Sequence, residues 1–138
     1  PGTSIDYPAV WGKDDKYYLD HGFNGEKQSG GTIFADSQNI PFVSANTIFY
    51  GHNMKDGSMF GDLKKYRDPG FLKEHPNVEI FYQGQWITCP IILAKVTDET
   101  DGTPYQKGER KILTLSTCYG TSKRMILQAL IPVAGGMN

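Results

Sequence analysis

The sequence lacks a strong net charge, a long hydrophobic run and more than a few arginines. Its 14 Lys and Arg residues nearly balance 15 Asp and Glu residues, which leaves a net charge of −1. The three arginines, Arg67, Arg110 and Arg124, are scattered, so no basic stripe indicates nucleic-acid binding. No apolar run approaches the roughly 20 residues of a membrane-spanning helix, and no signal peptide is evident.

Cysteine is also scarce. Cys89 and Cys118 are the only two, and two cysteines do not make a disulfide scaffold. They could form one bridge outside the cell, or one could be a structural thiol and the other a nucleophile. The count does not reveal the compartment in which the protein works.

Glycine, proline and aromatic residues are plentiful and favour strands and loops over helices. The 138 residues, 15.4 kDa in mass, are predicted to form one domain over 1–138. Apolar patterning predicts strands at 3–10, 32–35, 47–50, 77–82, 86–97, 111–118 and 125–131, with helical turns at 13–20, 58–66 and 71–75. So many strands in a small chain favour a closed barrel or a sandwich, because closure removes exposed strand edges.

One stretch combines a buried strand with a reactive side chain. Residues 111–118, KILTLSTC, predict a strand that ends at Cys118, and a second strand begins near Arg124 after a short polar loop. A hairpin of this kind would bring a thiol close to a guanidinium. We therefore take this hairpin as the candidate site of thiol chemistry.

A histidine occupies a comparable position on another strand. His52 follows the apolar strand TIFY, whereas His21 and His75 lie in polar segments and are interpreted as solvated or capping residues. A lone histidine at the end of a strand is usually structural. Together with Cys118 and Arg124, however, His52 becomes a candidate catalytic residue.

These three residue types suit acyl transfer. A thiol needs a neighbouring base or cation to react, and a histidine can supply that and later protonate a leaving amine. Arg124 keeps its proton, so it could stabilise an oxyanion or hold the substrate. Cys89, inside an apolar run beside Pro90, predicts a buried and inert thiol. No CxxC or HxxxH spacing supports a metal site, and we expect no metal or cofactor.

The motifs resemble one family. TLSTC followed by an arginine, with YGHNMKDGSMFGDLKKY upstream, closely resembles the class B sortases, and the phrase PGTSIDYPAVWGKDDKYYLDHGFNGEKQSGGTIFAD is similar to them as well. The likeness spans residues 1 to about 82 and resumes over 111–131.

The resemblance implies a mainly β fold, an eight-stranded closed sortase barrel with short helical insertions. It implies a cysteine transpeptidase that cleaves a sorting signal of surface proteins after Thr and transfers the acyl group to an amine of a peptidoglycan precursor or pilin. By motif position, Cys118 would be the nucleophile, His52 the acid and base, and Arg124 the oxyanion or substrate residue. Substrate-binding positions would map to the following residues: Leu19, Tyr50 and Ser116.

The resemblance also implies a location and some departures. Sortases act on the outer face of the plasma membrane of Gram-positive bacteria, held by an N-terminal anchor and helix that this sequence does not contain. The segment 98–110 is much shorter than the helix-containing insertion usual in class B. Two alternatives therefore stay open, a cysteine peptidase without transfer and a catalytically impaired barrel that binds sorting signals.

Overall fold

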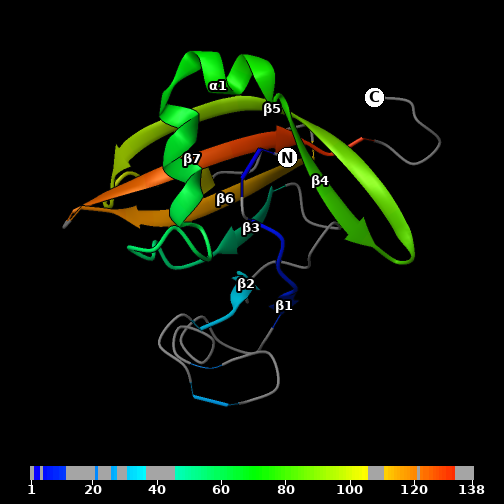
Figure 1. Cartoon of the computed structure of the whole chain (residues 1–138), viewed down its shortest axis with the longest axis horizontal. Coiled ribbons are helices and arrows are strands. Elements are labelled where there is room, and N and C mark those ends of the chain that lie inside the picture. Colours follow the sequence, from blue (N-terminus) through cyan, green and yellow to red (C-terminus); the bar gives the residue numbers. More distant parts are fainter. Residues whose placement is uncertain are drawn as a thin grey trace.

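The structure is a computed structural model, and it describes residues 2, 3, 5–11, 21, 26–27, 31–36, 46–105, 111–120 and 122–132. Seven strands form one sheet (Figure 1). The strands are β1 (Ala9–Trp11), β2 (Ile33–Ala35), β3 (Asn46–Tyr50), β4 (Asn77–Tyr82), β5 (Gln85–Asp98), β6 (Ile112–Tyr119) and β7 (Lys123–Leu130). Three short helices accompany them: the 3-10 helices η2 (Gly61–Arg67) and η3 (Thr103–Tyr105), and α1 (Pro69–Glu74).

The sheet has the order β1-β2-β3-β6-β7-β5-β4. β3 and β6 are parallel, while β6 pairs with β7 and β7 with β5 in antiparallel fashion. The centre of the sheet is therefore built from strands that are distant in sequence. The predicted hairpin that carries Cys118 and Arg124 is confirmed, because β6 and β7 pair over their whole lengths.

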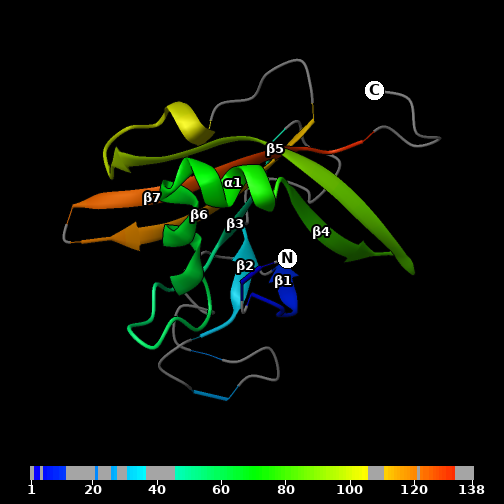
Figure 2. The same cartoon turned by 45° about the horizontal axis from the view of Figure 1, so that its top comes forward.

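The prediction of a closed eight-stranded barrel is wrong in its closure and its strand number. Among the described residues the seven-stranded sheet is open, with β1 and β4 at its two edges. β5 causes this shape, because its first half pairs with β4 and its second half, after a register shift between Ile91 and Leu93, pairs with β7. Pro90 lies at this change of partner, where its missing N–H costs no ladder bond. The β4–β5 hairpin consequently extends away from the sheet (Figures 1 and 2).

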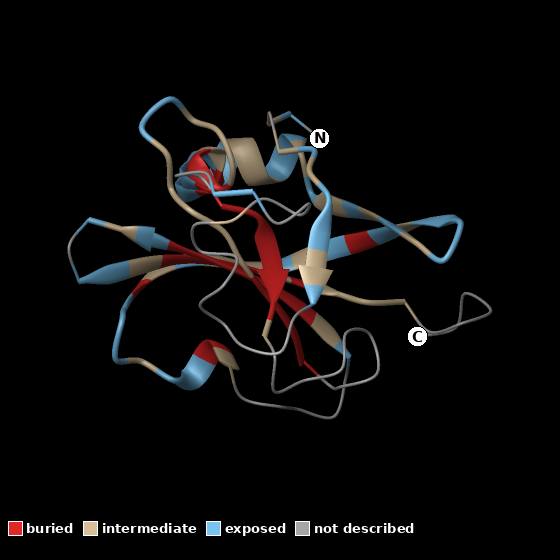
Figure 3. Ribbon diagram, turned by 90° about the horizontal axis from the view of Figure 1, so that it is seen from below, coloured by how far each residue is buried: buried red, intermediate tan, exposed pale blue. Residues whose placement is uncertain are grey.

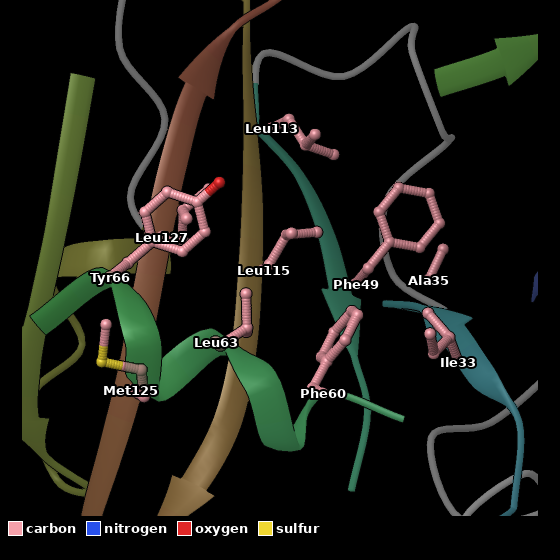
Figure 4. Packing of buried hydrophobic residues seen from close by; sticks show 10 residues of the cluster. All are labelled: Ile33, Ala35, Phe49, Phe60, Leu63, Tyr66, Leu113, Leu115, Met125 and Leu127. Atoms are coloured by element: carbon pink, nitrogen blue, oxygen red, sulfur yellow. The ribbon is translucent and has the colours of Figure 1, made fainter. Parts of the chain in front are cut away.

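The hydrophobic core lies on one face of the sheet. Alternate residues of β6 and β7, among them Leu115 and Leu127, point to this face and meet Leu63 and Tyr66 of η2 (Figure 4). Figure 3 shows that burial is greatest in the middle of the sheet and lowest at the hairpin ends. The opposite face of β6 carries the other residues of the strand, including Cys118.

Several local predictions change in the structure. The helix expected at 58–66 is a 3-10 helix, Gly61–Arg67, in which Leu63 and Tyr66 are buried at the i, i+3 spacing that aligns side chains in this helix type. Asp68 follows the end of η2 and caps α1 by accepting a hydrogen bond from the Gly70 N–H at 3.0 Å. The helical turns expected at 13–20 lie outside the described residues. In the described part of the chain, no helix has the length and hydropathy to span a membrane.

Candidate active site

The β6–β7 hairpin places a thiol opposite a guanidinium. Cys118 and Arg124 are direct partners in the ladder, and only residues 120–122 connect the two strands beyond Tyr119 and Lys123. Residues directly opposite each other in an antiparallel pair have Cβ atoms about 4.5–5.5 Å apart. Cys118 is an exposed free thiol, and Arg124 is half-buried. A reactive thiol at this position is open to a peptide.

The parallel pairing of β3 with β6 brings the segment that carries His52 to the end of the strand that carries Cys118. The register is constant from Asn46 opposite Ile112 to Tyr50 opposite Ser116, where the pairing ends. The Gly51 N–H donates to the Ser116 carbonyl at 3.2 Å at this last pair. His52 follows Gly51 and precedes Asn53, whose side chain contacts the Cys118 backbone.

The segment around His52 is fixed by contacts on both sides. The Phe60 N–H donates to the His52 carbonyl at 2.8 Å, and the Asn53 side-chain amide donates to the Cys118 carbonyl at 2.9 Å. Gly51 passes against the buried Phe60 ring, so closely that a Cβ at this position would lie 2.7 Å from a ring carbon. The sequence analysis did not predict Asn53 as a site residue, although its position next to His52 could have indicated one.

The structure therefore brings the three predicted catalytic residues to one end of three adjacent strands. Cys118 and Arg124 are ladder partners, and His52 follows β3, the neighbour of β6 on its other side. This end of the sheet therefore carries a candidate nucleophile, a candidate proton carrier and a permanent cation. The roles given to the three residues stay predictions.

The second cysteine has a different environment. Cys89, in β5, is 0% exposed, and burial raises the pKa of its thiol to about 11. Both cysteines are free thiols, so the bridge that the sequence left open is not formed. The prediction of a buried Cys89 is confirmed.

The predicted substrate-binding residues lie in three different situations. Tyr50 is half-buried at the end of β3, and Ser116 is fully buried in β6, two residues before the thiol. Tyr105 of η3 covers both, with its hydroxyl 2.9 Å from the Ser116 Oγ and its ring centroid 6.2 Å from that of Tyr50. Leu19 lies outside the described residues. Substrate binding by Tyr50, Ser116 and Leu19 stays a prediction.

The sequence analysis did not single out Tyr105, because it lies within the polar segment 98–110. The middle of this segment forms η3, in which Pro104 is buried. A Pro-Tyr pair within a polar turn was the only available signal.

The structure also has a hollow that lies away from the candidate active site. It measures about 720 Å³ and lies between the two edges of the sheet, lined mainly by β1, the segment before it, and β4. None of the three predicted catalytic residues lines it. Within the residues that the structure describes, no group of three or more His, Cys, Asp and Glu side chains could hold a metal ion.

Comparison with known proteins identifies the family. A family model described as the Sortase domain matches residues 1–131. The chain belongs to the sortase family. Sortase B of Listeria monocytogenes is 41% identical over 159 residues, which cover 91% of this chain and 64% of that protein.

Solved structures of class B sortases share the fold of this sortase domain. The structure of sortase B from Listeria monocytogenes has a TM-score of 0.83 with 36% identity, covering 94% of this chain and 89% of that one. A Staphylococcus aureus sortase B–substrate complex has a TM-score of 0.82 with 27% identity, covering 96% of this chain and 76% of that one. Recognition of the chain as a class B sortase relative is thereby confirmed.

The sortase chain is shorter than its relatives. It spans 64% of the length of the Listeria protein, and the aligned region of 159 residues exceeds the 138 residues of the whole chain. The relative therefore carries residues inside the aligned region that this chain lacks.

Proposed function

We propose that residues 1–138 act as a single catalytic domain of a cysteine transpeptidase, which cleaves the sorting signal of surface proteins after Thr and transfers the acyl group to an amine. The observation that carries this proposal is the end of three adjacent strands, where exposed Cys118 is opposite Arg124 and the segment after β3, which carries His52, contacts the Cys118 backbone through Asn53. Membership of the sortase family supports it.

The reaction has two steps, formation of a thioester on Cys118 and transfer of the acyl group to a second amine. The Cys118 thiol gives its proton to His52 and its sulfur attacks the Thr carbonyl carbon, and the negative charge that develops on the carbonyl oxygen is stabilised by the Arg124 guanidinium. The C–N bond then breaks, His52 passes that proton to the departing amine, and a thioester to Cys118 remains. A second amine attacks the thioester and loses a proton to His52, the C–S bond breaks, and His52 returns the proton to the Cys118 sulfur.

The acceptor is the amine of a peptidoglycan precursor or of a pilin, and the donor is a sorting-signal peptide of a surface protein. The enzyme would work at the outer face of the plasma membrane of a Gram-positive bacterium, in a membrane-anchored form. The bacterial class B sortases that the chain resembles support this location. Neither nucleic acid nor a cofactor takes part.

A transfer assay tests the proposal directly. The protein is incubated with a fluorescent sorting-signal peptide, with and without triglycine, and the ligated and hydrolysed products are separated by chromatography. We expect a ligated product that Cys118→Ala abolishes and that Cys89→Ala, the matched cysteine control, leaves at the wild-type rate. Arg124→Gln should lower kcat by roughly 10²–10³-fold, the usual effect of losing one oxyanion donor.

The two alternatives give different results in the same assay. Acid product formed at one rate with or without triglycine would identify a peptidase. The segment 98–110, shorter than the insertion usual in class B, is the reason to test the impaired barrel as well. Peptide binding without any product would identify the impaired barrel and end the transpeptidase proposal. Slow labelling of Cys118 by a thiol-reactive sorting-signal analogue, at a rate that the peptide part of the analogue does not raise, would do the same.

A further inference from the structure

The chain folds back on itself directly after His52. An isolated antiparallel bridge pairs Asn53 with Met59, and the Phe60 N–H donates to the His52 carbonyl at 2.8 Å. A turn connects the two sides, and we call residues 52–60 the His52 loop. Because the first residue of the loop is bonded to the last, the position of the His52 backbone depends on the position of the returning side.

Met59, on the returning side of the loop, has an unusual backbone conformation. Its φ is 55°, in the left-handed region that long side chains rarely adopt. Residues persist in such conformations only where the surrounding structure holds them. The Met59 N–H donates to the Tyr7 hydroxyl at 3.0 Å, and its half-buried side chain packs against the core. Contacts from outside the loop therefore hold Met59 in this conformation.

Tyr7 belongs to the segment before β1, which has its own anchors. Burial alternates along it, because Ile5 and Tyr7 are half-buried against the core whereas Asp6 and Pro8 are exposed. Figure 1 shows this segment, in blue, running across the sheet to β1, which then pairs with β2. The hydroxyl therefore reaches the His52 loop from a separately held part of the chain, 52 positions away from Met59 in the sequence.

We propose that Tyr7 is a positioning residue for the candidate base His52 and acts through the backbone of Met59. This inference rests on the function proposed above. Without the hydroxyl, the Met59 N–H loses its partner and the residue relaxes towards a negative φ, which shifts the returning side of the loop and the His52 carbonyl bonded to it. The Asn53 side chain, which donates to the Cys118 carbonyl at 2.9 Å, shifts with the loop. The hydroxyl thus keeps the backbone of His52 in one place relative to the strand that carries the thiol.

Tyr7→Phe removes the hydroxyl and keeps the ring, and the transfer assay measures the effect. We expect kcat to fall by about 2–10-fold, the equivalent of one hydrogen bond, with an unchanged KM for the peptide. The two constants separate because a displaced base slows the chemical steps and leaves peptide binding as it was. Tyr66→Phe is the matched control, because it also loses a hydroxyl bond to the backbone, at 3.1 Å to the His75 carbonyl, and it should keep the wild-type kcat.

A second substitution tests whether the effect passes through Met59. Asparagine adopts the left-handed conformation more readily than methionine, so Met59→Asn keeps the loop in place with less help from the hydroxyl. In the Met59→Asn background, Tyr7→Phe should therefore lower kcat by less than about twofold, a non-additivity that a double-mutant cycle measures. A hydroxyl that only stabilises the fold would give the same loss of kcat in both backgrounds, and that result would overturn the inference.

Amide hydrogen exchange followed by NMR separates this inference from the proposed function. The Phe60 N–H exchanges when its bond to the His52 carbonyl opens, so Tyr7→Phe should speed its exchange by about 2–10-fold and Tyr66→Phe should not. If the wild-type protein gives no ligated product, the transpeptidase proposal fails, yet faster exchange at Phe60 in Tyr7→Phe still supports the inference. Wild-type exchange at Phe60 in that variant overturns the inference whether or not turnover is seen. In an active enzyme, a wild-type kcat in Tyr7→Phe, or an equal loss of kcat in Tyr66→Phe, overturns it as well.

Discussion

Substitution of Gly51 by alanine is expected to destabilise the protein and to disturb the segment that carries His52. A Cβ at this position would lie 2.7 Å and 2.8 Å from two carbons of the Phe60 ring. Carbon atoms in proteins prefer separations of about 3.5–4.0 Å. The ring or the backbone must therefore move by most of an ångström.

The magnitude follows from the burial of Phe60. Its side chain is 2% exposed and belongs to the core cluster, so neighbouring side chains confine the ring. Adding atoms to a well-packed core typically costs about 1–3 kcal/mol. The Phe60 N–H also donates to the His52 carbonyl at 2.8 Å, so movement of Phe60 displaces the candidate base. We expect the free energy of unfolding to fall by about 1–3 kcal/mol and transfer activity to fall with it.

Urea denaturation followed by tryptophan fluorescence measures the stability, and the transfer assay measures the activity. Gly102→Ala is the matched control, because a Cβ there would have no heavy atom within 4 Å. It should change the free energy of unfolding by less than about 0.5 kcal/mol. Gly51→Ala/Phe60→Leu replaces the ring with a smaller side chain. In the Phe60→Leu background, the methyl added by Gly51→Ala should lower the free energy of unfolding by less than it does beside the native ring. A double-mutant cycle measures this difference.

Two results would refute the proposed clash. One is a Gly51→Ala variant that unfolds at the wild-type urea concentration with an unchanged slope. The other is a methyl whose cost is the same in the Phe60→Leu background as beside the native Phe60 ring, because the added atom would then not be meeting the ring.

Three further predictions concern the candidate site and its strand. At neutral pH iodoacetamide should label Cys118 and spare Cys89, whose pKa is raised to about 11, so labelling of Cys89 should begin only as the pH nears that value, as mass spectrometry of the digest would show. Asn53→Ala removes the hydrogen bond to the Cys118 carbonyl, worth about 0.5–1.5 kcal/mol, so kcat/KM should fall by up to about tenfold while Asn53→Asp, which cannot donate, behaves alike. Thr117→Val removes a buried hydroxyl that has no hydrogen-bond partner among the described residues, so the free energy of unfolding should rise by about 1 kcal/mol in urea denaturation.

Each of these has a contradicting outcome. Equal labelling of both cysteines at neutral pH would mean that the core opens around Cys89. Unchanged kinetics in Asn53→Ala would mean that the bond to Cys118 does not hold the thiol in place. A Thr117→Val variant less stable than the wild type would mean that the hydroxyl is satisfied in solution.

The sequence determined the strands and the hairpin because these depend on local patterns. Apolar patterning predicted a strand over 77–82, and β4 occupies the same residues. The β-branched run before Cys118 and the apolar run after Arg124 predicted two strands joined by a short loop, and they pair as expected. Residues close in sequence are held together by the connection itself.

The approach of His52 to Cys118 is a different case. The residues are 66 positions apart, and the parallel pairing of β3 with β6 brings their segments together at one end of the sheet. From the residues alone, His52 was a strand-end histidine like many others. The motif likeness to sortases supplied the pairing that local patterns could not, and the register of the sheet then gave it a physical basis.

What only the tertiary structure decided is how the sheet ends and what covers its second face. Closure depends on whether β1 and β4 pair, and these two strands, distant in the sequence, are the edges of the open sheet. The position of Tyr105 depends on hydrogen bonds from Asn46 and Gln128 to a single carbonyl, between residues far apart in the chain. Local patterns fix which residues form strands, because neighbours in sequence share a backbone; long-range contacts fix which surfaces meet, because those form only when the whole sheet has assembled.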